Sequence, residues 1–368
     1  MKFIKGNPFT ALMPAGLDRR RLASGAALQN ATDFAVGRDV RKIVWLPILL
    51  LAVPVMAIAW GGARWPFELA YHFVAHLAAL SAVLAGLYLA LRRYLAAATT
   101  LLFLVTYAGT LAATGGLSWG RAGAGPAIAA EPGFDLVSFN LLADQEDPGT
   151  MLAWLSGAPA DVLVLVESSE AWRRGFETLR PVYPYQALGL PLDRPAQTED
   201  PELTRMSGVA ILSRLPLRAA RAVYPAGRVK PALAAEIKVG ETWTTVVAVH
   251  TTKPLTRQGL ATRDRYLDGL AQALKPVQGP LVVAGDFNAT RYTPRFQNFT
   301  SALELDAPPG PPATYPARAQ NLGLAIDHVL VRGAAVTHLD AVPPRGSDHR
   351  GLLARIAIPA GPRLARIP

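Results

Sequence analysis

Residues 280–288 read PLVVAGDFN, a short apolar run that ends in two polar side chains, Asp286 and Asn288. An apolar run of this length between turn-forming residues predicts a buried β-strand. The end of a strand is where a sheet brings together side chains that are far apart in the sequence. The segment therefore predicts a strand that delivers a carboxylate and an amide to the rim of a sheet.

The same pattern recurs through the last two thirds of the chain. Short apolar runs predict strands at 136–141, 161–167, 208–213, 232–239, 242–251, 280–288, 325–331 and 351–358. Amphipathic stretches predict helices near 149–157, 169–179 and 255–274. Many strands with few helices favour two packed sheets with helices outside them.

Polar side chains close several of the predicted strands. They are Asn140, Glu167, His250, Asp286 and Asn288, while Asp348 and His349 directly precede the last strand. Phosphate esters repel nucleophiles, so their hydrolysis needs a cation on the phosphate oxygens and a positioned water. Carboxylates at separate strand ends favour a hard cation such as Mg²⁺ or Mn²⁺. The chain has no cysteine, which excludes disulfides, thiolate zinc sites and a cysteine nucleophile.

The first third of the chain is a separate, apolar region. Three long apolar runs occupy 43–60, 67–91 and 94–119, and the one charge within them is Glu68 at the edge of the second. About 20 apolar residues cross the hydrocarbon core of a bilayer. We therefore expect three transmembrane helices, the first kinked by its two prolines.

Basic residues predict the orientation of these helices. Six Lys and Arg residues fall within 19–42, and Arg92 and Arg93 separate the second run from the third, whereas the first loop has only Arg64. Short basic segments remain in the cytoplasm, so three crossings place the rest of the chain outside it. The predicted division is a cytoplasmic basic tail (1–42), three transmembrane helices (43–119), a linker (120–133) and a soluble domain (134–368).

The distribution of charge agrees with this division. The net charge is +10, but residues 1–120 hold 11 Lys and Arg against 4 Asp and Glu, and the remainder holds 26 against 23. The soluble domain is only mildly basic. Charge alone therefore gives no indication of a polyanionic partner.

Seven segments follow one another in the soluble domain: SFN (138–140), VES (166–168), GVAILSR (208–214), VHTTKP (249–254), GDFNAT (285–290), IDHVLV (326–331) and SDHR (347–350). Together they resemble the endonuclease/exonuclease/phosphatase superfamily, the fold of deoxyribonuclease I, over about residues 134–358. The resemblance implies an α+β fold, a four-layer α/β/β/α sandwich, here preceded by the three transmembrane helices. It also implies metal-dependent hydrolysis of phosphate esters by this domain.

The resemblance implies a metal site built from three of these residues. Glu167 would ligate the metal, Asn140 would lie beside it and hold metal or phosphate, and Asp348 would be an acid near the metal centre. The expected cofactor is Mg²⁺ or Mn²⁺.

Five further residues are implied to act on water and phosphate. Asp286 would align or deprotonate the attacking water, and Asn288 would donate a hydrogen bond to the phosphate. His349 would contact the scissile phosphate with its ring oriented by Asp327. His250 matches the position of a second phosphate-facing histidine.

Several alternatives stay open at this level. The substrate could be a nucleic acid, as for an endonuclease, or a lipid or inositol phosphate, and specificity is expected in the loop 183–207. A degenerate, membrane-tethered binding module is disfavoured because every expected position holds the expected residue type. A channel or transporter has little support, since the ionisable residues inside the runs are His72 and His76, which we expect to pack against a neighbouring helix. Arg214 fits a local structural bond as well as a substrate contact.

Overall fold

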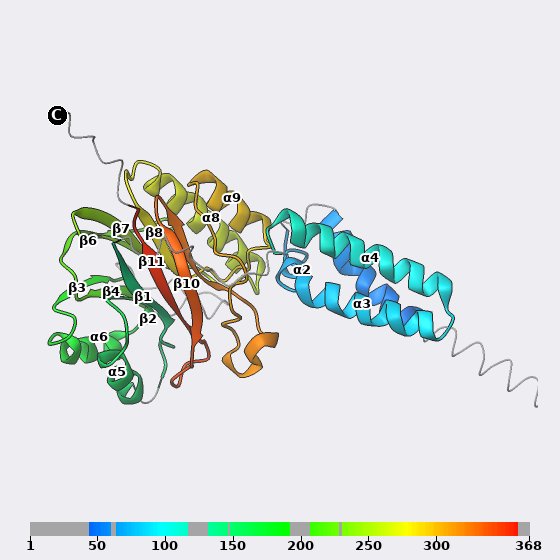
Figure 1. The fold of residues 1–368 in the computed structure, drawn as a ribbon, viewed down its shortest axis with the longest axis horizontal. Helices are drawn as coiled ribbons and strands as arrows, with labels where there is room; N and C mark the ends of the chain where they lie inside the picture. Colours follow the sequence, from blue (N-terminus) through cyan, green and yellow to red (C-terminus); the bar gives the residue numbers. More distant parts are fainter. Residues whose placement is uncertain are drawn as a thin grey trace, which may run out of the picture.

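The strand-length apolar runs form two sheets, and the long apolar runs form a helical bundle beside them (Figure 1). This computed structural model describes residues 44–59, 64–116, 132–145, 148–191, 207–227 and 230–359. The predicted basic tail, nearly all of the predicted linker and most of the predicted specificity loop lie outside the described residues.

One sheet has six strands in the order β10-β11-β1-β2-β4-β3. Its strands are β1 (Gly133–Asn140), β2 (Val162–Ser168), β3 (Tyr185–Gly189), β4 (Gly208–Ser213), β10 (Ala335–Val342) and β11 (Gly351–Ala357). The other has five strands in the order β5-β6-β7-β8-β9. Its strands are β5 (Leu217–Val223), β6 (Ala232–Val239), β7 (Thr242–His250), β8 (Leu281–Asp286) and β9 (Asp327–Arg332).

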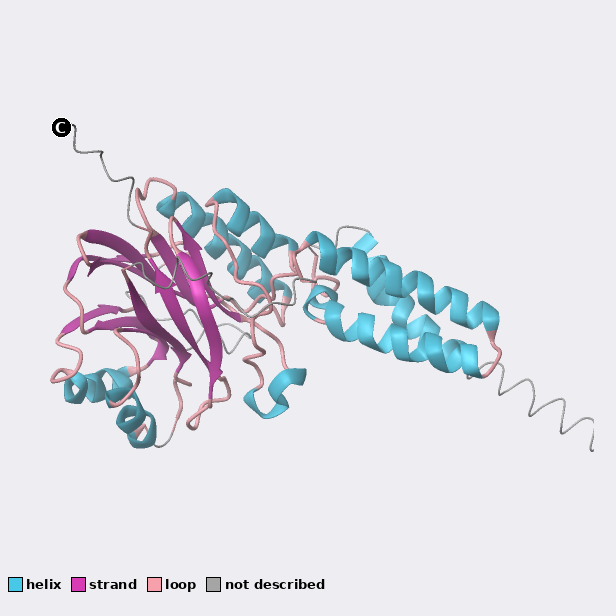
Figure 2. Ribbon diagram, in the orientation of Figure 1, coloured by secondary structure: helices cyan, strands magenta, loops and turns pink. Residues whose placement is uncertain are grey.

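The two sheets pack face to face, and helices cover their outer faces (Figure 2). Buried side chains such as Val164 and Val246 fill the space between the sheets. On the six-stranded sheet lie α5 (Gly149–Ser156) and α6 (Glu170–Phe176), and on the five-stranded sheet lie α8 (Arg257–Leu274) and α9 (Pro294–Ala302). The predicted two-sheet α+β sandwich is confirmed.

Strand pairing brings the polar strand ends to one rim. Strands β7 and β8 are parallel, with His250 opposite Asp286, and β8 and β9 are antiparallel, with Asp286 opposite Asp327. In the other sheet β1 runs parallel to β2, which places Asn140 beside the end of β2. Side chains from five strands therefore meet at the same edge of the sandwich.

Three strands and one helix were not predicted from the sequence. Strand β5 reads LRAARAV and is largely exposed, and β10 reads AVTHLDAV, so neither shows a continuous apolar run. Strand β3 and helix α9 have 5 and 9 residues, which is too short for a clear periodic signal. Their strand or helix state depends on pairing and packing with neighbours that lie elsewhere in the sequence.

The prediction of three helices of membrane-spanning length is corrected by the structure. In the described part of the chain, only α4 (Tyr94–Ala113) is long and apolar enough to cross a membrane. The helix Val44–Ala59 is shorter, and the second run is divided at Phe73 into α2 (Leu69–His72) and α3 (Val74–Ala90). Apolar composition alone did not reveal this interruption, because Phe73 is as apolar as its neighbours.

The bundle is attached to the sandwich by specific contacts. Nη2 of Arg263, in α8, lies 2.8 Å from Oε1 of Glu68, and both side chains are buried. Arg291 donates through Nε to the carbonyl oxygen of Thr114, just after α4 (3.1 Å), and Tyr292 packs against the apolar core of the bundle. Because a buried ion pair requires that both partners stay in place, these contacts fix one end of the bundle against the sandwich.

Candidate active site

Close approach of two strands places Asp286 at the rim. Gly285 has φ 137°, and a Cβ atom built there would lie 2.0 Å from the carbonyl oxygen of Val249 on β7. Only glycine fits such a contact. The sequence GD at the end of β8 therefore lets the backbone of β7 approach closely and sets Asp286 beside His250.

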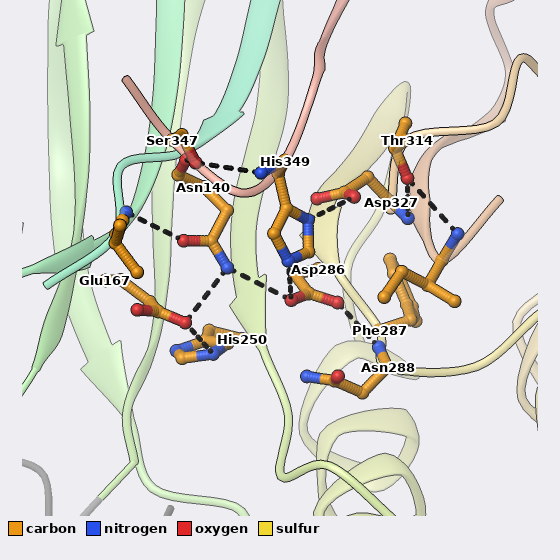
Figure 3. Close-up of polar contacts among 12 residues, drawn as sticks. Asn140, Glu167, His250, Asp286, Phe287, Asn288, Thr314, Asp327, Ser347 and His349 are labelled. Carbon is orange, nitrogen blue, oxygen red and sulfur yellow. Dashed lines mark hydrogen bonds and ion pairs between the residues drawn. The ribbon is translucent and has the colours of Figure 1, made fainter. Parts of the chain in front are cut away.

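The amide of Asn140 joins the two buried carboxylates of the site (Figure 3). Its Nδ2 donates to Oε1 of Glu167 at 3.0 Å and to Oδ2 of Asp286 at 3.2 Å. The other carboxylate oxygen of Glu167 accepts a hydrogen bond from the backbone N–H of Ala143 (3.0 Å), and Nε2 of His250 lies 3.5 Å from Oε1. Asn140, Glu167 and His250 were predicted as separate strand ends, and the structure brings them together.

Glu167 is held as a carboxylate in an unusual backbone conformation. Burial raises the pKa of its carboxyl, but the hydrogen bonds from Asn140 and Ala143 and the charges of Lys253 and Lys230 outweigh burial, so the pKa is lowered. Glu167 also has φ 57°, a conformation that costs energy for a residue with a side chain. An ionised carboxylate at a strained position is typical of a functional site.

A histidine and an aspartate form the second half of the site. Nδ1 of His349 lies 2.8 Å from Oδ2 of Asp327, and Nε2 lies 3.8 Å from Oδ2 of Asp286 (Figure 3). Ser347 holds the preceding loop, since its hydroxyl donates to the carbonyl oxygen of Asn140 and accepts from the N–H of His349. The predicted orientation of His349 by Asp327 is present in the structure.

The surroundings of Asp286 and His349 raise the pKa of both side chains. Burial and the nearby Asp327 raise the pKa of Asp286 to about 7, although His349 opposes this shift. Burial by itself lowers the pKa of His349, but the carboxylates of Asp327 and Asp286 raise it to about 9. Near neutral pH the site can therefore hold an imidazolium next to a carboxyl group that is able to exchange a proton.

Asn288 completes the rim on the five-stranded sheet. Its backbone N–H donates to Oδ1 of Asp286 at 2.8 Å, and its Nδ2 donates to the carbonyl oxygen of Thr251 at 3.1 Å. Like Glu167, Asn288 has a positive φ, here 45°. Asp286 is thus held on both of its oxygens, by Asn288 on one side and by Asn140 on the other.

These residues fit a hard divalent cation. Oε1 of Glu167 and Oδ2 of Asp286 both lie within 3.2 Å of Nδ2 of Asn140, so two buried carboxylates are close together, and oxygen donors are the ligands that Mg²⁺ prefers. In this arrangement Oδ1 of Asn140 accepts a hydrogen bond from the N–H of Leu142. Ligand atoms of Asp286, Asp327 and His349 also lie within 4.8 Å of one another. In that second group, however, Nδ1 of His349 already has Asp327 as its partner, so the group around Glu167 is the better fit.

Asp348, the third predicted ligand, directly precedes His349 in the loop after β10. It is half-buried, and its backbone carbonyl accepts a hydrogen bond from Ala317. Among the described residues, no hydrogen bond or ion pair joins its carboxylate to Glu167 or Asn140. Its effect here is electrostatic, because its charge helps to raise the pKa of His349.

Four residues near the site had no role assigned from the sequence. Thr314 accepts a hydrogen bond from the N–H of Asp327, and the ring of Tyr315 packs on the ring of His349 at 4.8 Å. The charges of Lys253 and the buried Lys230 act on Glu167. Lys253 lies inside VHTTKP and could have been found there, whereas Lys230, Thr314 and Tyr315 lie in no recognised motif.

Three further polar residues outside the site, His328, Arg214 and His76, have structural partners. His328 packs on Phe287 and Phe296, and its Nε2 lies 2.8 Å from the carbonyl oxygen of Ala289. Arg214 donates to the carbonyl oxygen of Ala158, which is the local bond rather than a substrate contact. His76, expected to pack against a helix, instead contacts the carbonyl oxygen of Leu322 in the sandwich.

The sandwich with a buried carboxylate, amide and histidine site at its rim has the form of a hydrolytic phosphoesterase. A sequence model described as the endonuclease/exonuclease/phosphatase family matches residues 137–349. The chain belongs to this family, whose members are metal-dependent phosphoesterases. A search of curated proteins finds no match.

Several solved structures resemble this chain, and the first of them shows the same fold. An endonuclease/exonuclease/phosphatase from Beutenbergia cavernae has 18% identity and a TM-score of 0.51, over 62% of this chain and 72% of that one. The human nocturnin catalytic domain with bound sulfate has 17% identity and a TM-score of 0.48, over 62% and 95%. Beta toxin from Staphylococcus aureus with bound magnesium ions has 14% identity and a TM-score of 0.46, over 60% and 99%. At 18% identity, the likeness to the Beutenbergia cavernae structure concerns the fold alone.

Proposed function

We propose that this chain is a divalent-metal-dependent phosphodiesterase. The observation that carries the proposal is the position of Asp286, fully buried with a pKa raised to about 7, between the amides of Asn140 and Asn288 and the ring of His349. A carboxylate that exchanges a proton near neutral pH can align and deprotonate a water molecule. The buried neighbours of Asp286 hold it in one orientation for this task.

Of the remaining residues, some would hold the cation and others would contact the phosphate. Glu167 and Asn140 would hold the cation, which when bound supplies positive charge to the phosphate oxygens. Nε2 of His349 is buried and has no hydrogen-bond partner among the described residues, so it can donate to a phosphate oxygen. Asp327 keeps the ring protonated and oriented, and Asn288 and His250 provide further contacts at the same rim.

We also propose that the bundle anchors the enzyme in a membrane with the catalytic domain outside the cytoplasm. In the described residues, all but four of the exposed large hydrophobic side chains lie between positions 45 and 105. A surface of this kind is unstable in water and marks a membrane or protein contact. The turn between α3 and α4 lies at the end of the bundle far from the sandwich (Figure 1), and it contains Arg92 and Arg93. This basic pair supports a cytoplasmic position for that end.

A substrate panel with metal removal tests the proposed reaction. The full chain would be assayed with Mg²⁺ against duplex DNA, RNA, phospholipids and the soluble diester bis-para-nitrophenyl phosphate. We expect hydrolysis of at least one diester, its loss in excess chelator and its recovery when Mg²⁺ or Mn²⁺ is restored. Full activity in excess chelator, or no hydrolysis of any member of the panel, would contradict the proposal.

A further inference from the structure

Two exposed leucines lie on the sandwich near the catalytic rim. Leu255 is 66% exposed and Leu322 is 79% exposed. In the described part of the sandwich, the other exposed large hydrophobic residues are Tyr185 and Leu188. These two belong to the edge strand β3, on the side of the sandwich away from the bundle (Figure 1).

Both leucines lie where the sandwich meets the bundle. The carbonyl oxygen of Leu255 accepts a hydrogen bond from Nε1 of Trp65 at 3.1 Å, and that of Leu322 lies 2.9 Å from Nε2 of His76. Trp65 is itself 37% exposed. The leucines therefore extend the exposed apolar surface of the bundle onto the catalytic domain.

The segments that carry the leucines also form one side of the catalytic site. Lys253 lies two residues before Leu255, and its Nζ is 5.8 Å from the centre of the Tyr315 ring. Tyr315 packs on His349, and the following Ala317 donates its N–H to the carbonyl oxygen of Asp348 at 2.7 Å. From there the chain continues to Leu322. The side of the site formed by Lys253 and Tyr315 is thus the side that borders the bundle.

A cavity of about 290 Å³ lies between the bundle and this side of the sandwich. His76 lines it from α3, and Thr290, Tyr292 and Leu322 line it from the sandwich. Thr290 is 2% exposed, its hydroxyl has no hydrogen-bond partner among the described residues, and it follows Asn288 by two positions. The cavity combines apolar walls with a buried hydroxyl close to the catalytic rim, a combination suited to part of an amphiphilic molecule.

We propose that the substrate is a phosphodiester carried by a membrane lipid, taken from the membrane that holds the bundle. Leu255 and Leu322 enter the lipid surface beside the catalytic rim, and the cavity receives part of the lipid next to its phosphate. Water attacks phosphorus, one ester P–O bond breaks, and the departing oxygen takes a proton, which gives an alcohol and a phosphomonoester. This inference rests on the proposed phosphodiesterase function and names its substrate class.

The test compares a lipid substrate with a soluble one in the same preparation. The full chain is reconstituted with Mg²⁺ in equimolar phosphatidylethanolamine and phosphatidylglycerol vesicles. Diacylglycerol and water-soluble products are measured together with hydrolysis of bis-para-nitrophenyl phosphate. In the double variant Leu255→Glu/Leu322→Glu, we expect the ratio of lipid to soluble hydrolysis to fall about tenfold or more, because two apolar contacts with lipid are lost. The matched control Ala220→Glu introduces the same charge at an exposed position of the edge strand β5, outside the predicted specificity loop, and should keep the ratio of the unaltered protein.

The outcomes separate this inference from the proposed function. Hydrolysis of the soluble diester without lipid hydrolysis, or an unchanged ratio in the double variant, would overturn the lipid inference and leave the phosphodiesterase in place. Preferred hydrolysis of duplex DNA over vesicle lipid would do the same. No hydrolysis of any diester would overturn the proposed function itself. If the double variant fails to fold, as judged by circular dichroism, Leu322→Ser is measured in the same way and decides the result.

Discussion

At the scale of single residues, Asp286 is the group on which the proposed chemistry depends most directly. Substitution by Asn keeps its shape and its position between Asn140 and Asn288, but removes the ability to accept a proton. We expect turnover of a soluble phosphodiester to fall by about 10²-fold or more. Thermal unfolding followed by circular dichroism serves as the folding control. A variant that keeps more than a tenth of the activity would show that another group activates the water.

The pair of Asp327 and His349 predicts a particular pH dependence. The charge of Asp327 is the main influence that raises the pKa of His349, to about 9 from an ordinary 6.5. The imidazolium is present below the pKa and lost above it, so activity should decline as the pH rises through about 9. In Asp327→Asn the decline should begin at lower pH, because the carboxylate charge that raises the pKa of His349 has been removed. A pH–rate profile with an unmoved alkaline limb would contradict this role.

His349 is further expected to act on the phosphate rather than on the metal. Its Nδ1 is occupied by Asp327, and the residues around Glu167 are the better fit for the cation. In His349→Ala, turnover should fall about 10²-fold or more, while the affinity for Mg²⁺, measured by calorimetric titration, should change little. Loss of metal binding with the fold intact would make His349 a ligand.

At the scale of elements, the pairing of β7 with β8 depends on Gly285. Substitution by Ala would force a Cβ atom against the carbonyl oxygen of Val249, at a φ of 137° that other residues rarely adopt. We expect a loss of about 2 kcal/mol or more in the free energy of unfolding, measured by denaturant titration. Gly157→Ala is the matched control, since its Cβ atom would meet no atom closer than 3.9 Å. Equal effects at both positions would mean that the strand contact is not tight.

At the scale of the whole molecule, the orientation of the bundle predicts where the catalytic domain resides. A reporter enzyme that is active only outside the cytoplasm should work when fused after residue 130 and fail when fused after Arg93, because the basic pair at Arg92 and Arg93 favours the cytoplasm. Western blots of both fusions control for expression. The reverse pattern would place the domain beside cytoplasmic substrates and would show that the basic residues do not set this orientation.

The amino-acid sequence alone was enough to predict the two-sheet fold and the polar side chains that meet at one rim of the sandwich. Asn140, Glu167, His250, Asp286, Asn288, Asp327 and His349 follow or precede predicted strands, and the structure brings all seven to one rim. This was possible because a buried strand leaves a continuous apolar run, and because GDFN and SDH are specific motifs. The run of apolar residues near the N-terminus likewise predicted a separate helical region.

The tertiary structure decided what depends on contacts between distant segments. Exposed edge strands such as β5 have no apolar pattern and form only because a neighbour offers hydrogen bonds. The break at Phe73 and the packing of Tyr315 on His349 have no local signal either. The same holds for Leu255 and Leu322, which are ordinary apolar residues in the sequence. They lie exposed beside the bundle and the catalytic rim because segments far apart in the sequence pack together. Leu255 contacts Trp65, which is 190 positions away, and Leu322 contacts His76, which is 246 positions away.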